Sequence, residues 1–198
     1  TSVTSDTSVT SDTSVTSEIS STMSNYIENL SMTHTIKAQS IPYFDLYVTP
    51  EDFDRLQNGL RHMDGVRVSL IESTAEQFVN SLKPIDNSVV IFPVFTAAAY
   101  HEPGFYNYFA GNCDESCITD LSFEKFTFNF GGSGATAQIL YHAGYNFLTD
   151  VEVDKNSEIL ENYDTVILLH NEYVTKKECN AISSHPNLIF LHPNALYA

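Results

Sequence analysis

Between residues 88 and 191, short apolar runs alternate with stretches in which apolar residues recur at helical spacing. The runs SVVIFPVF, DTVILL and NLIFL hold few polar residues, which is typical of strands buried on both faces of a sheet. The expected strands in this part are 88–95, 147–153, 164–169 and 187–191. The expected helices are 136–145, 157–163 and 175–183, the last of which opens with a capping box of Thr175 and Glu178. Strands separated by helices in this way predict a parallel sheet.

The alternation already starts at residue 43, where 43–48 and then 66–71 are strand-like. The run Thr49-Pro50-Glu51-Asp52 opens a helix, because it combines an N-cap, a proline at the first helical position and acids in the first turn. A second helix is expected to turn Phe78, Val79 and Leu82 inward. The predicted fold class is therefore α/β, with a doubly wound, mostly parallel sheet of about six strands.

The first eighteen residues are a polar six-residue unit, TSVTSD, repeated three times with Glu in place of the last Asp. A Ser/Thr-rich tract of this kind is typical of a solvated stalk. Thr and Val also favour extended backbone, so the repeat could instead dock as a strand on a neighbouring subunit. In a strand, Val3 would share one face with Thr1 and Ser5. We divide the chain into an arm and linker, 1–40, and an α/β domain, 41–198.

An aromatic insert, residues 100–135, interrupts the α/β pattern and carries Cys113 and Cys117 in a polar loop. A local disulfide between them is the favoured interpretation, with two free thiols or a metal site as alternatives. The aromatic side chains either form a small satellite core or serve a sugar or protein interface. The interface residues that we expect, together with Val3 of the arm, are Tyr106, Tyr108 and Phe109.

The net charge of −16 argues against nucleic acid and anionic membranes as partners, since both require basic patches. No window of about 18 apolar residues is present, so we expect no membrane insertion. Asn29 lies in an Asn-x-Ser glycosylation motif. With the Ser/Thr-rich arm and the expected disulfide, this predicts an extracellular or cell-surface protein whose partners are further copies of itself and possible glycans.

Polar side chains with metal-binding or acid–base chemistry follow three of the expected strands. They are His101, His170, Glu172 and His192. The carboxyl ends of parallel strands meet at one edge of a sheet, so these residues could converge on a divalent metal or act as acid and base. The alternative is structural: they cap the next helix and fill the loops with hydrogen bonds. We predict no other cofactor and no catalytic residue.

Three stretches carry a resemblance to a known family: His142–Asp150, Tyr163–Thr175 and Leu188–Leu196. Together, residues 136–198 resemble the glutamine-amidotransferase-like domain, a flavodoxin-like fold, in the form found in dimethylformamidase-type large subunits and related archaeal surface proteins. That family has a nucleophilic Cys in a Gly-x-Cys-x-Gly turn. Here the last strand runs into His192-Pro193-Asn194, without Cys or Gly, so the resemblance implies the fold but not the amidotransferase chemistry.

These patterns predict a structural or adhesive subunit of a cell surface or filament, built on a catalytically dead amidotransferase-like domain. The arm and the aromatic insert would make the contacts between subunits. A metal-assisted hydrolase with a His/Glu site at the strand ends is the first alternative. A carbohydrate-binding module that uses the aromatic insert is the second.

Overall fold

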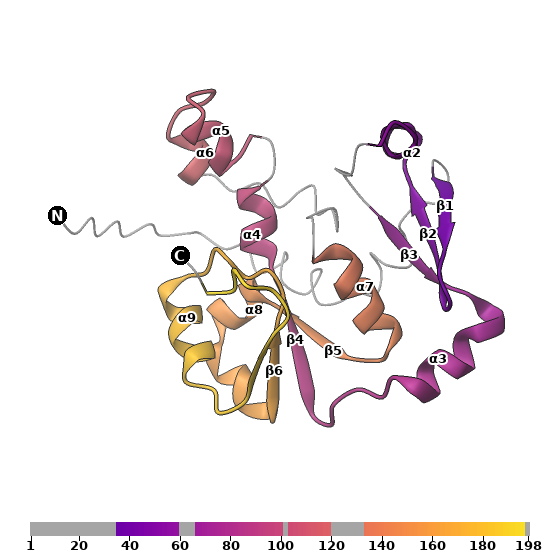
Figure 1. The fold of residues 1–198 in the computed structure, drawn as a ribbon. Helices are drawn as coiled ribbons and strands as arrows, with labels where there is room; N and C mark the ends of the chain where they lie inside the picture. Colours follow the sequence, from indigo (N-terminus) through magenta and orange to yellow (C-terminus); the bar gives the residue numbers. More distant parts are fainter. Residues whose placement is uncertain (1–34, 60–65, 101–102, 120–132, 197–198) are drawn as a thin grey trace.

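The structure, a computed structural model, describes residues 35–59, 66–100, 103–119 and 133–196 (Figure 1). Two sheets are present, and helix α7 (Gly134–His142) lies between them. The arm with Val3, the glycosylation motif at Asn29, His101 and residues 120–132 of the insert lie outside the described residues. What the sequence predicts for them stays a prediction.

The larger sheet is parallel and has four strands in the order β5-β4-β6-β7. The strands are β4 (Ser88–Phe92), β5 (Asn146–Thr149), β6 (Thr165–Leu168) and β7 (Leu188–Phe190). β4 is central, and its Val90 is in register with Phe147 on one side and Ile167 on the other. Every residue of β4 is buried, as the apolar run predicts for a strand covered on both faces.

Helices cover both faces of this sheet, which confirms the doubly wound α/β class. On one face, Ala137 of α7 packs against Val90, Phe92 and Ile167. On the other face lie the helices α8 (Asp150–Lys155), η3 (Ser157–Asn162) and α9 (Lys176–Ser183). Their core contacts include Val153, Leu160 and Ile182, which pack against Val89 and Leu168.

The prediction of about six strands in one parallel sheet is wrong. The segments 43–48 and 66–71 instead join a separate antiparallel sheet in the order β1-β2-β3. Its strands are β1 (Ile36–Ser40), β2 (Phe44–Val48) and β3 (Arg67–Leu70). These strands bury only some of their residues, whereas β4 and β6 are continuously apolar, and such one-sided burial is characteristic of antiparallel sheets.

Two helices and a 3-10 turn accompany this smaller sheet: α2 (Pro50–Gln57), η2 (Glu72–Thr74) and α3 (Ala75–Ser81). Thr49 caps α2 as predicted, because its side chain accepts a hydrogen bond from Asp52 N. In α3 only Phe78 is buried, packing edge-on against Phe44. The inward orientation predicted for Val79 and Leu82 is wrong, since both side chains are exposed.

Gln138 of α7 joins the two sheets. Its Oε1 accepts a hydrogen bond from Val68 N at 2.8 Å, and its Nε2 donates to Val66 O at 2.8 Å. The side chain is fully buried, so both bonds are shielded from water. His142, one helical turn further along, lies 3.3 Å from Val68 O. Helix α7 therefore supplies the hydrogen bonds that a fourth strand would otherwise give to β3.

Two predicted strands end earlier than their apolar runs. β4 stops at Phe92 because Pro93 has no N–H, and helix α4 (Val94–Ala99) follows, with Phe95 N donating to Asp150 Oδ2 at 2.9 Å. β5 stops at Thr149, which forms a reciprocal capping box with Glu152 and opens α8. Beyond α4 lie α5 (Phe105–Phe109) and α6 (Ser116–Thr119), which stand away from the sheet (Figure 1). No helix in the described ranges has the length and apolar character needed to cross a bilayer.

Candidate functional site

The candidate site lies at the carboxyl ends of β4 and β6. In chain order, the path leaves β4 for β5 on one side and then returns to β6 on the other side. The ends of β4 and β6 therefore form the topological switch point, where doubly wound sheets bind their ligands. Helix α4 continues from β4 toward Tyr100, and residues 169–173 continue from β6.

The centre of the site is the carboxyl group of Glu172, which is 8% exposed. Its Oε2 accepts a hydrogen bond from Tyr100 Oη at 2.7 Å and lies 3.0 Å from His170 Nε2. Tyr106 Oη donates in turn to Tyr100 Oη at 2.8 Å. Burial, together with the hydrogen bonds to Tyr106 and Glu172, raises the pKa of Tyr100 well above its usual range, so its hydroxyl keeps its proton and remains a donor.

Two imidazole rings stack beside this carboxyl group. The ring centroids of His170 and His192 are 3.8 Å apart with the planes 28° apart. His192 Nδ1 accepts from Asn194 N at 3.2 Å, which places the proton of the neutral ring on Nε2. Burial lowers the pKa of His170, the neighbouring His192 lowers it further, and the bond to Glu172 opposes both effects. His170 is therefore a neutral ring at neutral pH, able to donate to Glu172 through Nε2.

Backbone hydrogen bonds hold these side chains in place. His170 N donates to Ser133 Oγ at 2.9 Å, Leu169 N donates to Asn171 Oδ1 at 3.0 Å, and Tyr173 N donates to Thr96 Oγ1 at 3.0 Å. Ser133, Thr96 and Asn171 are all buried. The loop after β6 is thus tied to α4 and to the start of α7, which is the rigid support that a binding site requires.

The structure brings together three of the four residues that the sequence assigns to a metal or ligand, namely His170, Glu172 and His192. The fourth, His101, lies outside the described residues. Within the described ranges, no three His, Cys, Asp or Glu side chains are placed to hold a metal ion. The stacked rings present faces to each other, whereas metal ligation requires ring nitrogens that converge on one point. The geometry as it stands is that of a hydrogen-bonded acid–base cluster.

Tyr100 and Tyr173 belong to this site, although the sequence assigns no site role to either. Tyr100 is 72 residues from its partner Glu172, so no local motif joins them. Tyr173 packs edge-on against Tyr100 and Phe105, with ring centroids 6.0 Å and 5.1 Å apart. Burial raises the pKa of Tyr173 to about 12. The sequence offers only a positional signal for these two residues. Tyr173 comes shortly after the buried strand β6, and Tyr100 follows the helix that comes after β4.

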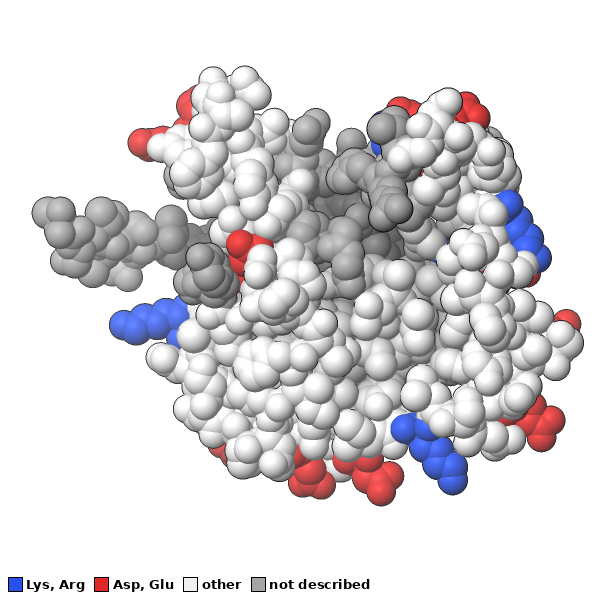
Figure 2. Space-filling view, in the orientation of Figure 1, with Lys and Arg blue, Asp and Glu red and all other residues white. Residues whose placement is uncertain are grey.

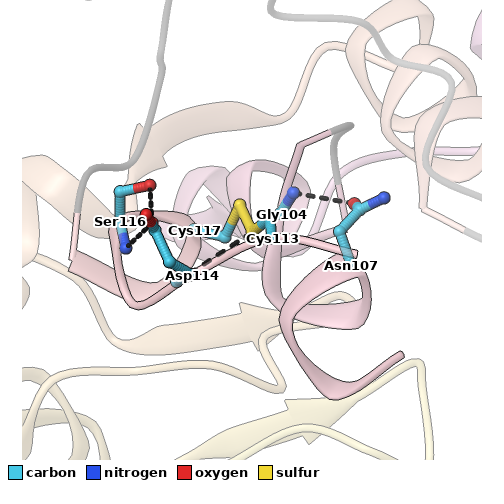
Figure 3. Close-up of a disulfide and its surroundings, with 6 residues drawn as sticks. All are labelled: Gly104, Asn107, Cys113, Asp114, Ser116 and Cys117. Atoms are coloured by element: carbon cyan, nitrogen blue, oxygen red, sulfur yellow. Dashed lines mark hydrogen bonds between the residues drawn. A yellow bond between two sulfur atoms is a disulfide. The ribbon is translucent and has the colours of Figure 1, made fainter. Parts of the chain in front are cut away.

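The insert forms a small aromatic knob, which we define as residues 103–119 with helices α5 and α6. Cys113 and Cys117 form the predicted disulfide, with their Cα atoms 6.4 Å apart (Figure 3). Asn107 Oδ1 accepts from Gly104 N at 2.9 Å at the start of α5, and Asp114 Oδ1 accepts from Ser116 N at 3.0 Å before α6. Disulfides persist in oxidising compartments, so this bond favours a location outside the cytoplasm.

The two aromatic faces of the knob have different roles. Phe105 and Tyr106 face the site, where Tyr106 packs on Tyr100 with centroids 4.6 Å apart. Phe109 is 69% exposed and Tyr106 is half exposed, while Tyr108 is partly buried. The sequence left open whether the aromatic residues are buried or exposed. Within the described part of the insert, no aromatic side chain is fully buried: Phe105 and Tyr108 are partly buried, and Tyr106 and Phe109 are exposed.

Charged side chains lie mainly around the margin of the face shown in Figure 2, and most of that face carries neither sign of charge. A groove with three acids lies at the other end of the parallel sheet, between η3 and α9. It is lined by Glu158, Glu161, Asp164 and His185, among others. The two ring nitrogens of His185 lie 2.9 Å from Tyr163 O and 3.0 Å from Asn187 O. We therefore assign His185 a structural role, which is to tie α9 to the strands.

A second group of buried carboxyls lies between α8 and α9. Asp150 and Glu178 are fully buried, and Thr175 Oγ1 donates to Asp154 Oδ1 at 2.5 Å beside them. Burial raises the pKa of Asp150, and the nearby Glu178 raises it further. Burial also raises the pKa of Glu178 to about 8. The sequence predicts Glu178 as the reciprocal member of a capping box, yet neither of its carboxyl oxygens has a hydrogen-bond partner among the described residues.

No known protein family matches the chain, and no curated protein or solved structure shows significant similarity to it. The resemblance to amidotransferase-like domains therefore stays a prediction. What this molecule does has to follow from the geometry of its described residues.

Proposed function

We propose that this protein is an extracellular structural or adhesive subunit that assembles through its aromatic knob and its N-terminal arm. The observation that carries the proposal is the exposure of large aromatic side chains on a helix linked to a disulfide loop. Phe109 projects from a five-residue helix, α5, that packs on the body of the protein through Phe105 and Tyr173. Tyr106 is half exposed beside it, and the inner side of its ring packs on Tyr100. Aromatic anchors of this kind dominate the binding energy of protein interfaces.

The support of the knob makes these side chains suitable as anchors. Phe105 packs edge-on against both Phe109 and Tyr173, with centroids 4.7 Å and 5.1 Å apart. An interface residue that is already ordered loses little conformational entropy on binding, so more of the contact energy appears as affinity.

Sedimentation velocity across a range of protein concentrations tests this proposal. We expect the wild type to form species larger than one chain, and Phe109→Ser to shift the equilibrium toward single chains by roughly tenfold or more. Val79→Ser is the matched control, because Val79 is an exposed hydrophobic residue on α3, away from the knob. A wild-type protein that stays a single chain at every concentration would refute self-assembly.

A second candidate function is acid–base chemistry at the strand ends, and the specific observation in its favour is the bond between His170 and Glu172. A neutral His beside a carboxyl group, at a topological switch point, is a general acid–base arrangement. A bound divalent metal would turn the site toward hydrolysis. Bound metal measured on purified protein, and cleavage of ester and amide substrates by the wild type but not by Glu172→Gln, would establish this candidate.

Carbohydrate binding is the remaining alternative, since Tyr106 and Tyr108 offer ring faces to sugars. Glycan binding that is lost in Tyr106→Ala but kept in Val79→Ser would favour it over self-association.

A further inference from the structure

The outer side of β7 is an open strand edge. Along β7, Leu191 N donates to Leu168 O and Asn187 O accepts from Val166 N, so these two residues turn their backbone groups toward β6. Backbone groups alternate along a strand, hence the N–H and C=O of Leu188 and Phe190 point away from β6. No strand within the described ranges pairs with that side. In five-stranded doubly wound sheets of order 2-1-3-4-5, a further strand lies at this position.

Both edges of the smaller sheet are protected. Gln138 and His142 supply side-chain hydrogen-bonding groups to the outer side of β3. β1 has a register irregularity between Lys37 and Gln39, and Lys37 forms an ion pair with Asp45 at 2.7 Å. Bulges and edge lysines are the usual devices that prevent unwanted strand addition. The edge of β7 has neither of these devices.

The side chains of β7 also belong to an interior strand. Leu188 packs with the core on one face of the sheet and Ile189 with the core on the other face, but neither is fully covered. Phe190 is 51% exposed and Leu191 48%. At the opposite edge of the sheet, β5 buries Leu148 and Thr149. Burying the exposed apolar surface along β7 would favour the addition of one more strand.

The N-terminal arm has the chemistry of such a strand. Its three hexads contain no Pro or Gly, so every residue offers both an N–H and a C=O to a neighbouring strand. Six is an even number, so Val3, Val9 and Val15 fall on one face of an extended arm, roughly 20 Å apart. The segment Leu188–Leu191 carries no charge, and the acid of each hexad therefore meets no like charge there.

We propose that the outer side of β7 accepts, as an added strand, one hexad of the N-terminal arm of a second copy of this chain. This inference rests on the proposed self-assembly and names one of its contacts. A second copy is the expected donor because each chain has three equivalent hexads, whereas among the described strands β7 alone combines an unpaired outer side with a large apolar side chain that is half exposed, Phe190. The spare hexads would link further copies, and such multivalent attachment raises avidity without new kinds of contact.

Hydrogen–deuterium exchange of the full-length protein, compared at low and high concentration, tests this contact directly. We expect the amides of Leu188 and Phe190 to exchange at least roughly tenfold more slowly at high concentration, because the arm then holds them in hydrogen bonds. The amide of Ile189 faces β6 and serves as an internal control, since its exchange should not depend on concentration.

Two matched triple variants test whether the protection of Leu188 and Phe190 depends on which face of the arm is substituted or only on the charge that is added. Val3→Lys, Val9→Lys and Val15→Lys together place lysines on the face that carries the apolar residues, and should abolish the protection of Leu188 and Phe190. Thr4→Lys, Thr10→Lys and Thr16→Lys add the same charge on the other face, and should keep most of it. Phe190→Lys changes the acceptor strand β7 instead of the arm, and should also abolish the protection of Leu188. Residue 190 is half exposed, so the variant should still fold.

The outcomes distinguish this inference from the function on which it rests. If the protein assembles, but Leu188 and Phe190 exchange equally fast at both concentrations, the strand contact is refuted while assembly through the knob stands. If protection occurs without dependence on concentration, the arm pairs within its own chain and the second-copy donor is refuted. A protein that never assembles refutes both.

Discussion

Glu172 and Glu178 are six residues apart, and both are buried, but their carboxyl groups are in opposite situations. Glu172 Oε2 receives Tyr100 Oη and lies in hydrogen-bond distance of His170 Nε2. Neither oxygen of Glu178 has a partner among the described residues, and its pKa rises to about 8. Hydrogen-bond donors stabilise a buried carboxylate, whereas a carboxyl group without them binds a proton instead.

The two regions differ in the hydrogen-bond donors that surround their buried carboxyl groups. At the strand ends, Tyr100 and His170 both reach the carboxyl group of Glu172, and Tyr106 extends the network by donating to the Tyr100 hydroxyl. Between α8 and α9, burial raises the pKa of both Asp150 and Glu178, although Asp150 still accepts hydrogen bonds from Phe95 N and Val151 N. A carboxyl group that is held by side-chain hydrogen bonds from separate elements is the better candidate for function, because those bonds position it for a ligand.

The largest expected effect is on the pH dependence of the free energy of unfolding, when the carboxyl group of Glu178 is removed. The pKa of Glu178 is about 8 in the fold and 4.5 ordinarily, so the folded state binds more protons between these values. The stability that this proton gives is fully present below about pH 4.5 and is lost as the pH rises to 8, on the order of 5 kcal/mol in total. We expect Glu178→Gln to remove that slope in urea unfolding measured from pH 5 to 8.

The exposed Glu158 on η3 offers a control for this experiment, since Glu158→Gln leaves the buried carboxyl untouched. Its pH dependence should match the wild type. If Glu178→Gln also matches the wild type, the carboxyl of Glu178 is ionised in the fold and the contrast with Glu172 disappears.

The next largest effect on the free energy of unfolding should come from removing one of the hydrogen-bond donors to Glu172. Tyr100→Phe removes the hydroxyl that binds Glu172 and Tyr106, and hydrogen bonds to charged groups contribute about 1.5–3 kcal/mol. We expect a loss of that size in the free energy of unfolding at pH 7. Tyr108→Phe, a matched change in the neighbouring knob, should change the free energy of unfolding by less than about 0.5 kcal/mol. Equal effects of the two variants would mean that the hydroxyl bond to Glu172 contributes nothing specific.

A smaller effect is expected at His170, because Glu172 partly offsets the burial that lowers its pKa. The unfolded chain protonates this ring near pH 6.5, and the folded chain only at lower pH. Stability from this residue is therefore lost as the pH falls below about 6.5. An NMR titration of the ring should place its midpoint below 6.5 in the folded protein, and Glu172→Gln should lower that midpoint further. A midpoint above 6.5 would show that Glu172 dominates over burial.

The smallest effect should come from Tyr106→Phe. Its hydroxyl donates to another hydroxyl at a half-exposed position, and such neutral bonds contribute about 0.5–1 kcal/mol. Unfolding in urea should show a loss of that order, well below the loss in Tyr100→Phe. A larger loss in Tyr106→Phe would place the centre of the network at Tyr106 rather than at Glu172.

The sequence predicts the parallel sheet well because the apolar runs in β4, β6 and β7 fit only strands with two buried faces. It predicts β2 and β3 correctly as strands but assigns them to the wrong sheet, because their partial burial depends on which neighbours cover them. It also extends β5 through 147–153, because Val151 and Val153 continue the alternation, while the capping box of Thr149 and Glu152 already ends the strand. Local patterns compete at such points, and only tertiary packing decides between them.

For the site, strand ends were a sufficient guide to His170, Glu172 and His192, since parallel strands bring their carboxyl ends together. The same reasoning could not find Tyr100 as their partner, because α4 carries it to the site from another strand. The Thr-x-x-Glu motif was misleading at Glu178. Thr175 caps α9 as predicted, with Glu178 N donating to its Oγ1, but the Glu side chain turns into the interior, where α8 packs.

Gln138 limits which variants of this protein could survive. Its amide gives one acceptor to Val68 N and one donor to Val66 O, and the same Nε2 reaches Gly134 O at 3.2 Å. Glutamate has nearly the same shape but no donor, so it would set a carboxylate against two carbonyl oxygens in a site without water. Gln138→Glu should therefore be strongly destabilising, although it changes the shape of the side chain very little. In a library of substitutions at position 138 that is selected for folded protein, Glu should be depleted as strongly as Pro.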